Sequence, residues 1–436
     1  MPLAPDTIGS YWEASVEIAA VDPALGTDLS AEVAVIGAGY TGLSAALRLA
    51  EAGVSVAVLD AKSVGWGASG RNGGFCCFGG TKLPETELIR RFGLDEAKRF
   101  VRYQIEAIET VKTRLDAWGV DADRHSDGEI ILAHRPRDFA EFSETAELLD
   151  RHFGYRPKIL SRDALKTAGI QGPEFFGGLH VPFGFALNPM KYVLALADQA
   201  RAAGANVFGD SPVTAVAREG AGWRLKSPSG SVHAQKVILA GNGYASEDAP
   251  RWLAGRTLPV MSSILVTRPL TESECAGQGW TSDLMAADTR TLLHYFRLLP
   301  DRRFLFGTRG GIFETKSALA AMKRRSRADF ERMFPAWADV ETEYFWSGHV
   351  CLARRLTPFV GPVPEMDGVV AAMAWHGSGI AMASLSGETA ADLVLGRIAP
   401  ADLPAAMATP FARFPLPALR RAYLQAAYWW FGFKDR

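Results

Sequence analysis

The feature that most constrains the fold is a glycine pattern near the start of the chain, Gly37-x-Gly39-x-x-Gly42. An apolar run at residues 31–36 precedes it and is typical of a buried strand, and residues 40–52 follow with apolar positions at helical spacing. In such a unit the first glycine permits a tight turn, the second admits a pyrophosphate close to the backbone, and the third lets helix and strand pack closely. The pattern therefore predicts a Rossmann-like unit that binds a dinucleotide at the helix N-terminus.

An acidic residue ends the next expected strand. Residues 54–59 are apolar and lead into Asp60, where a carboxylate accepts hydrogen bonds from ribose hydroxyls. The alternative is an ordinary strand–helix–strand unit without a ligand, but such a unit does not need the glycine pattern and the acidic strand end together. We expect the dinucleotide to contact Gly37, Gly39, Tyr40, Thr41, Gly42, Asp60 and Ala61.

A loop of small residues, 65–74, follows this strand. Its glycines let backbone N–H groups approach a ligand, and two polar side chains add further contacts. A flexible surface loop is the alternative, but the position directly after the acidic strand end favours ligand contact. The expected contacts are Ala68, Ser69, Gly70, Arg71, Asn72 and Gly73.

Together the two motifs, residues 31–75, resemble the N-terminus of the D-amino-acid oxidase superfamily of flavoproteins, and within it most closely the gamma-glutamylputrescine oxidases. The likeness recurs at 237–244, 292–298, 346–348 and 377–380 and so spans nearly the whole chain. It implies FAD as the cofactor and an amine or amino acid as the substrate. Phe75 and Asn188 stand where the putrescine-type enzymes tend to have glutamine and histidine, so the substrate need not be theirs.

The resemblance also implies an α/β fold, α+β overall, in which a discontinuous Rossmann-like FAD-binding domain joins a substrate domain with an antiparallel sheet. The expected FAD-binding segments are 31–85, 181–257 and 356–400, the substrate segments are 86–180 and 258–355, and residues 401–436 form an aromatic tail. Two interpretations of the tail remain: an interfacial membrane anchor, or packing against the protein's own surface or a partner subunit, which the aromatic tails of the related oxidases favour.

A second helix N-terminus is expected to face the flavin. The helix that starts near Ile380 follows Gly377-Ser378-Gly379, and its positive end would stabilise negative charge on the reduced ring. The related oxidases usually carry Gly-His-Gly at this turn, whereas this chain has Ser378 there. The full set of later cofactor contacts is Val213, Gly241, Gly377, Ser378, Gly379 and Ile380.

Few dedicated catalytic side chains are expected, because the flavin itself is the electron sink. Arg297 is suited to bind a carboxylate bidentately, although an outward-facing structural arginine fits the sequence equally well. Tyr295 fits a core position as well as a pocket position. The catalytic candidates are His376, Ser378, Arg297 and Tyr295, and the further substrate contacts are Arg309, His349 and Trp346.

The four cysteines lack the pattern of a disulfide framework and of a zinc site. Some relatives, the sarcosine oxidases, attach flavin covalently through a cysteine near a Thr-Pro pair, and Cys351 precedes Thr357-Pro358. A buried, inert thiol is the alternative for Cys351. No metal is expected.

Composition excludes several classes of protein. The 436 residues carry a net charge of −1, which gives no electrostatic reason to bind nucleic acid. No apolar stretch has the length of a transmembrane helix, the N-terminus lacks a signal-peptide pattern, and the few cysteines suit a reducing compartment, so a cytoplasmic location is expected. The sequence assigns no oligomeric state.

The sequence thus predicts an FAD-dependent amine or amino-acid oxidase that uses molecular oxygen and releases hydrogen peroxide. One alternative is a dehydrogenase that passes electrons to a carrier or quinone. The other is a dinucleotide-binding protein without catalytic activity.

Overall fold

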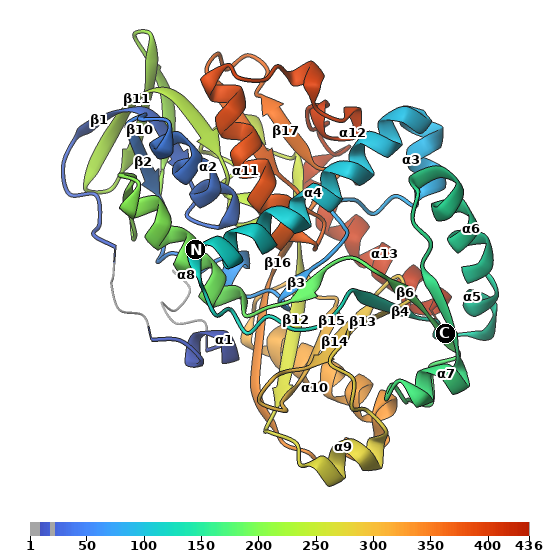
Figure 1. The fold of residues 1–436 in the computed structure, drawn as a ribbon. Helices are drawn as coiled ribbons and strands as arrows, with labels where there is room; N and C mark the ends of the chain where they lie inside the picture. Colours follow the sequence, from blue (N-terminus) through green and yellow to red (C-terminus); the bar gives the residue numbers. More distant parts are fainter. Residues whose placement is uncertain (1–8, 18–21, 436) are drawn as a thin grey trace.

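Two eight-stranded sheets organise the described part of the chain, residues 9–17 and 22–435 of a computed structural model (Figure 1). The first sheet has the strand order β17-β18-β11-β1-β2-β8, with β10 and β9 joined to β11. Its strands are β1 (Leu29–Ile36), β2 (Val56–Leu59), β8 (Asn206–Phe208), β9 (Ala215–Glu219), β10 (Gly222–Ser227), β11 (Gly230–Leu239), β17 (Phe359–Pro362) and β18 (Val369–Met373).

The centre of this sheet is parallel and buried on both faces. Strand β1 pairs in parallel with β11 and β2, with Val35 opposite Ile238 and Val58. Strand β18 extends the parallel arrangement beyond β11. Near-continuous apolar strands are typical of parallel sheets that helices cover on both sides. The Rossmann-like arrangement predicted around the glycine pattern is therefore present.

Helices α2 (Tyr40–Glu51), α8 (Pro189–Ala202) and α11 (Gly379–Leu395) pack beside this sheet, and α4 (Leu94–Trp118) lies against α11. Glycine permits the close approach of α11 to α2, because a Cβ on Gly387 would lie 2.3 Å from the Thr41 carbonyl oxygen. Helix α8 begins directly after Asn188, whose side chain accepts hydrogen bonds from the N–H groups of Met190 and Lys191. Of these helices, α2 and α11 bring their N-termini to the cavity between the sheets.

The second sheet has the order β16-β12-β15-β14-β13-β4-β6-β5. Its neighbours pair antiparallel, as predicted, except that β13 and β4 run parallel. Its strands are β4 (Glu129–Leu132), β5 (Lys158–Ser161), β6 (Gly177–Val181), β12 (Thr257–Thr267), β13 (Met285–Asp288), β14 (His294–Leu298), β15 (Phe304–Arg309) and β16 (Thr342–Ala353), and β3 (Phe75–Cys76) pairs separately with β7 (Phe185–Ala186).

An aromatic core joins the second sheet to helix α10 (Lys316–Met333). Phe304 and Phe306 from β15 meet Phe330 of α10, and all three are fully buried.

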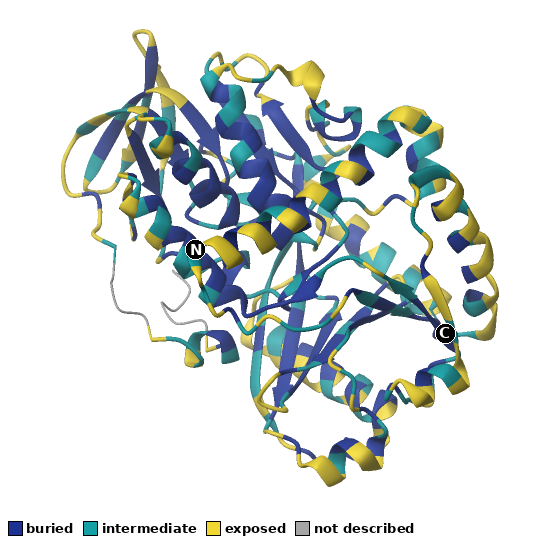
Figure 2. Cartoon of the chain, viewed as in Figure 1, coloured by how far each residue is buried: buried dark blue, intermediate teal, exposed yellow. Residues whose placement is uncertain are grey.

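Figure 2 shows buried residues through both sheets and exposed residues on the outer faces of the helices. The remaining helices are α1 (Tyr11–Ala14), α3 (Glu85–Phe92), α5 (Pro136–Ala140), α6 (Phe142–Phe153), α7 (Arg162–Thr167), α9 (Glu272–Gln278), α12 (Ala405–Ala408) and α13 (Arg420–Lys434).

The aromatic tail forms α13, and one of its faces packs on the protein. Leu424 is buried against Leu258 and Val260, and the Asp435 carboxylate that follows the helix accepts hydrogen bonds from two backbone N–H groups of the 291–292 turn. The other face exposes Trp429 by 73% and Phe433 by 72%. Among the described residues, no helix combines the length and apolar character that crossing a membrane requires.

Candidate active site

A cavity of about 870 Å³ lies where the two sheets meet. The first sheet contributes the turn after β1, the loop 65–73 and the start of α11, and the second sheet contributes Ser262, Ile264, Tyr295 and Arg309. This volume lies within the usual range for sites that hold a cofactor or a small ligand.

The glycine turn forms one end of the cavity. Gly37, with φ of 109°, Gly39, Tyr40 and Thr41 line it. A Cβ on Gly39 would come within 2.8 Å of the Ser69 hydroxyl oxygen. Gly42 lies outside the lining, but a Cβ there would be 1.8 Å from the Gly37 carbonyl oxygen. The turn therefore leaves room for a phosphate at the N-terminus of α2, as the pattern requires.

Asp60 lies at the same end. One carboxylate oxygen accepts a 2.6 Å hydrogen bond from the Ala38 N–H, and the other accepts a 2.9 Å bond from the Lys62 N–H. Burial raises the pKa of this carboxyl, while the hydrogen bonds oppose that shift. Ala61, Val213 and Gly241, which were predicted as cofactor contacts, line the same cavity.

The polar side chains of loop 65–74 hold its shape. Asn72 donates to the Ser69 carbonyl and accepts from the Gly74 N–H, each at 2.8 Å. The Arg71 guanidinium donates to the Trp66 carbonyl at 2.7 Å and lies 4.3 Å from the centre of the Trp66 ring. Ala68, Ser69, Arg71, Asn72 and Gly73 line the cavity, whereas Gly70 packs against Gly65 and Met190.

Helix α11 directs its N-terminus into the cavity. Gly377, Ser378, Gly379 and Ile380 line the wall, and within the described chain no side chain caps this helix start. Its first N–H groups are therefore available to a ligand that carries partial negative charge. Two helix N-termini, a glycine cradle and a carboxylate thus border one cavity, an arrangement that fits FAD.

Two of the four catalytic candidates line the cavity. Ser378 is at the start of α11, and the Tyr295 hydroxyl lies 3.0 Å from the Ser262 hydroxyl on the second sheet. His376 does not line the cavity. Its Nδ1 donates to the Gly80 carbonyl at 3.0 Å, its Nε2 accepts from the Ala353 N–H at 3.1 Å, and burial lowers its pKa to about 3. A neutral ring that holds two backbone groups has no free atom for substrate.

Arg297 also lies away from the cavity, which corrects its prediction as a substrate contact. It is fully buried and donates to the carbonyls of Gly73 at 3.1 Å and Leu187 at 2.8 Å. A third contact joins it to the His125 ring. Since these partners engage its guanidinium, Arg297 is a structural arginine that anchors the glycine loop to strand β14.

Arg309, unlike Arg297, lines the cavity. Its guanidinium packs on the α11 turn so closely that a Cβ on Gly377 would lie 2.5 Å from Nη2. Its Nε is buried, and no hydrogen-bond partner for it occurs in the described part of the chain. Burial lowers the pKa of the group. A half-buried cation whose Nε lacks a partner favours an anionic or neutral ligand group beside it.

Of the remaining candidates, His349 and Cys351 line the cavity and Trp346 does not. His349 lines the cavity and forms a 2.7 Å ion pair with Glu314. Trp346 lies behind the wall, where its indole N–H donates to the Arg71 carbonyl at 2.8 Å. Cys351 lines the cavity, and burial raises the pKa of its thiol to about 12, so it is protonated at neutral pH.

Several polar residues in the lining were not predicted, among them Lys82, Gln104, Glu129 and Tyr155. They come from separate segments, a loop, α4, β4 and the loop after α6. Each is a single polar residue without a motif around it, so the sequence carries no signal for them.

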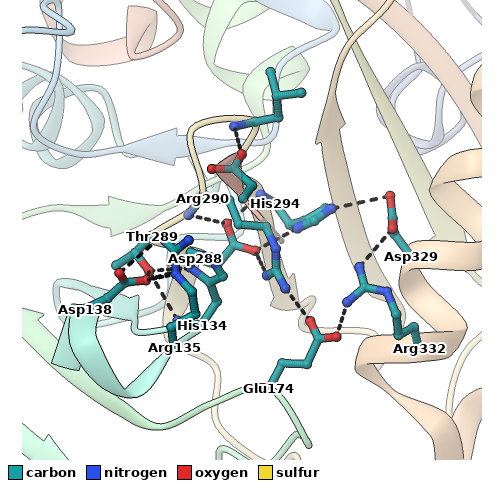
Figure 3. Close-up of polar contacts among 12 residues, drawn as sticks. His134, Arg135, Asp138, Glu174, Asp288, Thr289, Arg290, His294, Asp329 and Arg332 are labelled. Carbon is teal, nitrogen blue, oxygen red and sulfur yellow. Dashed lines mark hydrogen bonds and ion pairs between the residues drawn. The ribbon is translucent and has the colours of Figure 1, made fainter. Parts of the chain in front are cut away.

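Around the β13–β14 connection, six charged side chains form a closed ring of ion pairs (Figure 3). His294 pairs with Asp288 at 2.7 Å and with Asp329 at 3.5 Å. Arg290 joins Asp288 to Glu174, each at 2.5 Å, and Arg332 closes the ring between Glu174 and Asp329. The ring ties α10 to the β13–β14 connection behind the cavity, which Asp288 helps to line.

A family model described as FAD dependent oxidoreductase matches residues 32–393. A probable oxidoreductase OrdL of Rhizobium meliloti is 30% identical over 437 residues, with 98% of this chain and 97% of the relative covered. Gamma-glutamylputrescine oxidoreductase of Escherichia coli is 28% identical over 388 residues, with 89% of each chain covered. The crystal structure of glycine oxidase from Geobacillus kaustophilus superposes with a TM-score of 0.74 at 18% identity, covering 88% of this chain and 99% of that one, and so shares the fold.

Proposed function

The chain belongs to the DAO family of FAD-dependent oxidoreductases, and we propose that it oxidises an amine or amino acid and passes the electrons to molecular oxygen. The observation that carries this proposal is the continuity of one cavity from the glycine cradle to Tyr295 and Arg309 on the second sheet. A cofactor held in the cradle would present its ring to a substrate on that wall.

We propose that FAD lies with its pyrophosphate at the N-terminus of α2, its ribose at Asp60 and its adenine near Val213. When bound, FAD supplies a hydride acceptor for the carbon that carries the amine and returns the electrons to oxygen as hydrogen peroxide. The proposed contacts are Gly37, Gly39, Tyr40, Thr41, Asp60, Ala61, Ala68, Ser69, Arg71, Asn72, Gly73, Val213, Gly241, Gly377, Ser378, Gly379 and Ile380, all of which line the cavity.

The protein's task at the reacting end is to hold a neutral amine. An ammonium has no lone pair with which to assist departure of a hydride, so the amine must first lose a proton. The unpartnered Arg309 cation disfavours a second positive charge beside it. Tyr295 and Ile264 give the wall an aromatic and an aliphatic surface, which adds the desolvation that favours the neutral amine.

One observation favours an alternative electron acceptor. The exposed aromatic face of α13, with Trp429 and Phe433, suits the docking of a redox partner. Oxygen uptake separates the two functions, because a dehydrogenase with bound amine would consume little oxygen until an artificial acceptor is added.

The test is a screen of amines and amino acids against the purified holoenzyme, with flavin bleaching followed without oxygen and peroxide measured with oxygen. The proposal expects a subset of amines to bleach the flavin and to release peroxide. Bleaching without peroxide supports the dehydrogenase. A protein that copurifies with no flavin contradicts both.

A further inference from the structure

Helix α13 is held on the protein along one side and at both ends. Leu424, on its inner side, is buried against strand β12. At the start of the helix Arg420 forms a 2.5 Å ion pair with Glu247. At its end the Arg135 guanidinium donates a 2.8 Å hydrogen bond to the Lys434 carbonyl. These contacts determine which side of the helix faces outward.

The outward side of α13 is an apolar stripe. Six of the eight large hydrophobic side chains that the described chain leaves exposed lie in residues 416–433. Five of these six recur at intervals of three, four and seven residues along the helix, so they share one face. The apolar stripe consists of Leu419, Tyr423, Trp429, Trp430 and Phe433. A patch of this kind is typical of a surface that binds a partner or a membrane.

The charged residues in and around the apolar stripe are all basic. Residues 422–433 carry no charged side chain, and the wider segment 403–434 has no Asp or Glu. Besides Arg420 this segment contains Arg413, Arg421 and Lys434, which are exposed and form no ion pair with any described residue. The whole chain, by contrast, has a net charge of −1. The outward side of α13 is therefore apolar with a basic border.

We propose that α13 binds the surface of an anionic lipid bilayer, with its apolar stripe in the headgroup region. Trp and Tyr are typical of this region, because each ring has an apolar body and one polar group. Basic side chains beside such a stripe attract anionic lipids. The inference goes beyond the proposed function and does not depend on it, since no residue of the stripe lines the cavity.

The length of the helix requires binding in the plane of the membrane. As a helix, the uncharged residues 422–433 extend about 18 Å, whereas the hydrocarbon core of a bilayer is roughly 30 Å thick. The inner side of α13 also stays on the protein through Leu424. The helix therefore lies on the bilayer and does not cross it.

Charge makes a second copy of the chain a poorer occupant of this face. A two-fold dimer brings the same patch of both copies together. The basic border of one stripe would then face the basic border of the other, and segment 403–434 has no acid to pair with them. A protein partner would need acidic side chains around an apolar surface, whereas an anionic bilayer combines negative headgroups and apolar chains by its composition.

The test is cosedimentation of the purified holoenzyme with two kinds of vesicle, phosphatidylcholine alone and equal parts of phosphatidylcholine and phosphatidylglycerol. Binding to the anionic vesicles is expected to be about tenfold tighter or more, and to weaken as salt is added. Equal affinity for the two vesicles would overturn the proposal. So would absence of binding, including the case in which loss of the stripe converts a dimer into a monomer.

One double variant tests the apolar stripe. Trp429→Gln with Phe433→Gln is expected to weaken binding to the anionic vesicles about tenfold or more. These side chains are 73% and 72% exposed, so flavin content and thermal stability should not change. The matched control is Ile159→Gln, which removes an exposed apolar side chain on β5, at the sheet edge opposite β16. Unchanged binding by the double variant would contradict the assignment.

A second double variant tests the basic border. Arg421→Gln with Lys434→Gln is expected to weaken binding to the anionic vesicles roughly twentyfold, at about fivefold for each charge, and to leave binding to neutral vesicles unchanged. The control is Arg102→Gln with Lys226→Gln, which removes exposed basic residues from α4 and β10. An equal loss in the control would mean that charge anywhere on the protein attracts the vesicles.

Tryptophan fluorescence identifies the surface that touches lipid without a loss of binding. Vesicles whose lipids carry bromine near the headgroup should quench the unmodified protein. Trp429→Phe with Trp430→Phe keeps the stripe apolar, so this variant should still bind but lose most of the quenching. Full quenching in this variant would place another part of the protein at the membrane and overturn the proposal.

Discussion

At the scale of single residues, backbone requirements were predictable and the directions of polar side chains were not. Gly37 and Gly39 lie where predicted because a tight turn and a close approach need the absence of a side chain, which the local sequence reveals. Arg297 and His376 instead form hydrogen bonds with backbone groups of distant segments. Those partners come from other segments, so no local pattern distinguishes Arg297 from the cavity-facing Arg309.

Gly39→Val is expected to abolish flavin binding, because the new side chain would occupy the space between the turn and the Ser69 hydroxyl. The ratio of flavin absorbance to protein absorbance after purification measures this. Gly26→Val is the matched control, since no atom lies within 4 Å of a Cβ added there. Normal flavin content in Gly39→Val would mean that the pyrophosphate lies elsewhere.

Cys351→Ser is expected to retain FAD. The thiol is protonated at neutral pH because burial raises its pKa to about 12, and a thiol is a poor nucleophile compared with a thiolate. Acid precipitation of the unmodified protein should release the yellow colour into the supernatant. A coloured pellet from the unmodified protein, together with a colourless pellet from Cys351→Ser, would establish the covalent bond that the sequence left open.

At the scale of elements, strongly patterned segments were predicted and short or interrupted ones were missed. Helix α11 begins one residue from its expected start, because small and apolar residues follow a glycine turn. The apolar pattern of residues 85–118 is helical throughout, but the structure divides the segment into α3 and α4 at Gly93, whose φ of 84° lies outside the helical region. Strand β13, with the four residues Met285–Asp288, carries too little periodicity to separate a strand from a loop.

The ion-pair ring that holds α10 to the β13–β14 connection is expected to make stability depend on pH. Contacts with Asp288 and Asp329 raise the pKa of His294, while burial opposes that shift. A folded-state pKa above the unfolded value of about 6.5 means that this contribution is complete below that pH and is lost as pH rises through the folded pKa. His294→Gln should therefore cost about 1.5–3 kcal/mol at pH 6 and less at pH 9.

Urea unfolding of both proteins at the two pH values measures this difference. His233→Gln is the control, because His233 is exposed and lies 4.0 Å from Glu219, so its replacement should change stability little at either pH. An equal cost of His294→Gln at pH 6 and pH 9 would mean that the ring is held by an uncharged histidine.

At the scale of the whole molecule, the cavity exists because the chain returns to the first sheet after building the second. The family resemblance predicted the two sheets, and the structure confirms that fold class, although the residue boundaries of the domains stay a prediction. The part of the cavity wall that β4, β6, α6 and the loop after α6 form was not predictable, since these segments meet only in three dimensions. The parts proposed to hold the cofactor were easier to predict, because the glycine turn, the loop 65–74 and the turn before α11 are each local motifs.

Arg309→Leu is expected to raise the apparent pKa for flavin reduction by about one pH unit or more, because it removes the positive charge that favours a neutral amine. Arg309→Lys keeps that charge, so its apparent pKa should stay close to that of the unmodified protein. Anaerobic rapid mixing at several pH values measures both variants. An apparent pKa that Arg309→Leu does not change would mean that another group promotes the loss of the proton.

The most direct test of the account is the pH dependence of flavin reduction in the unmodified protein, measured by anaerobic rapid mixing with an amine that the screen identifies. Free alkyl ammonium groups lose their proton near pH 10.4, and the half-buried Arg309 cation with the apolar wall beside it should lower that value. The account predicts a rate that rises with pH to a plateau, with an apparent pKa below that of the free amine. A rate that is flat or falls with increasing pH would contradict oxidation of a neutral amine in this cavity.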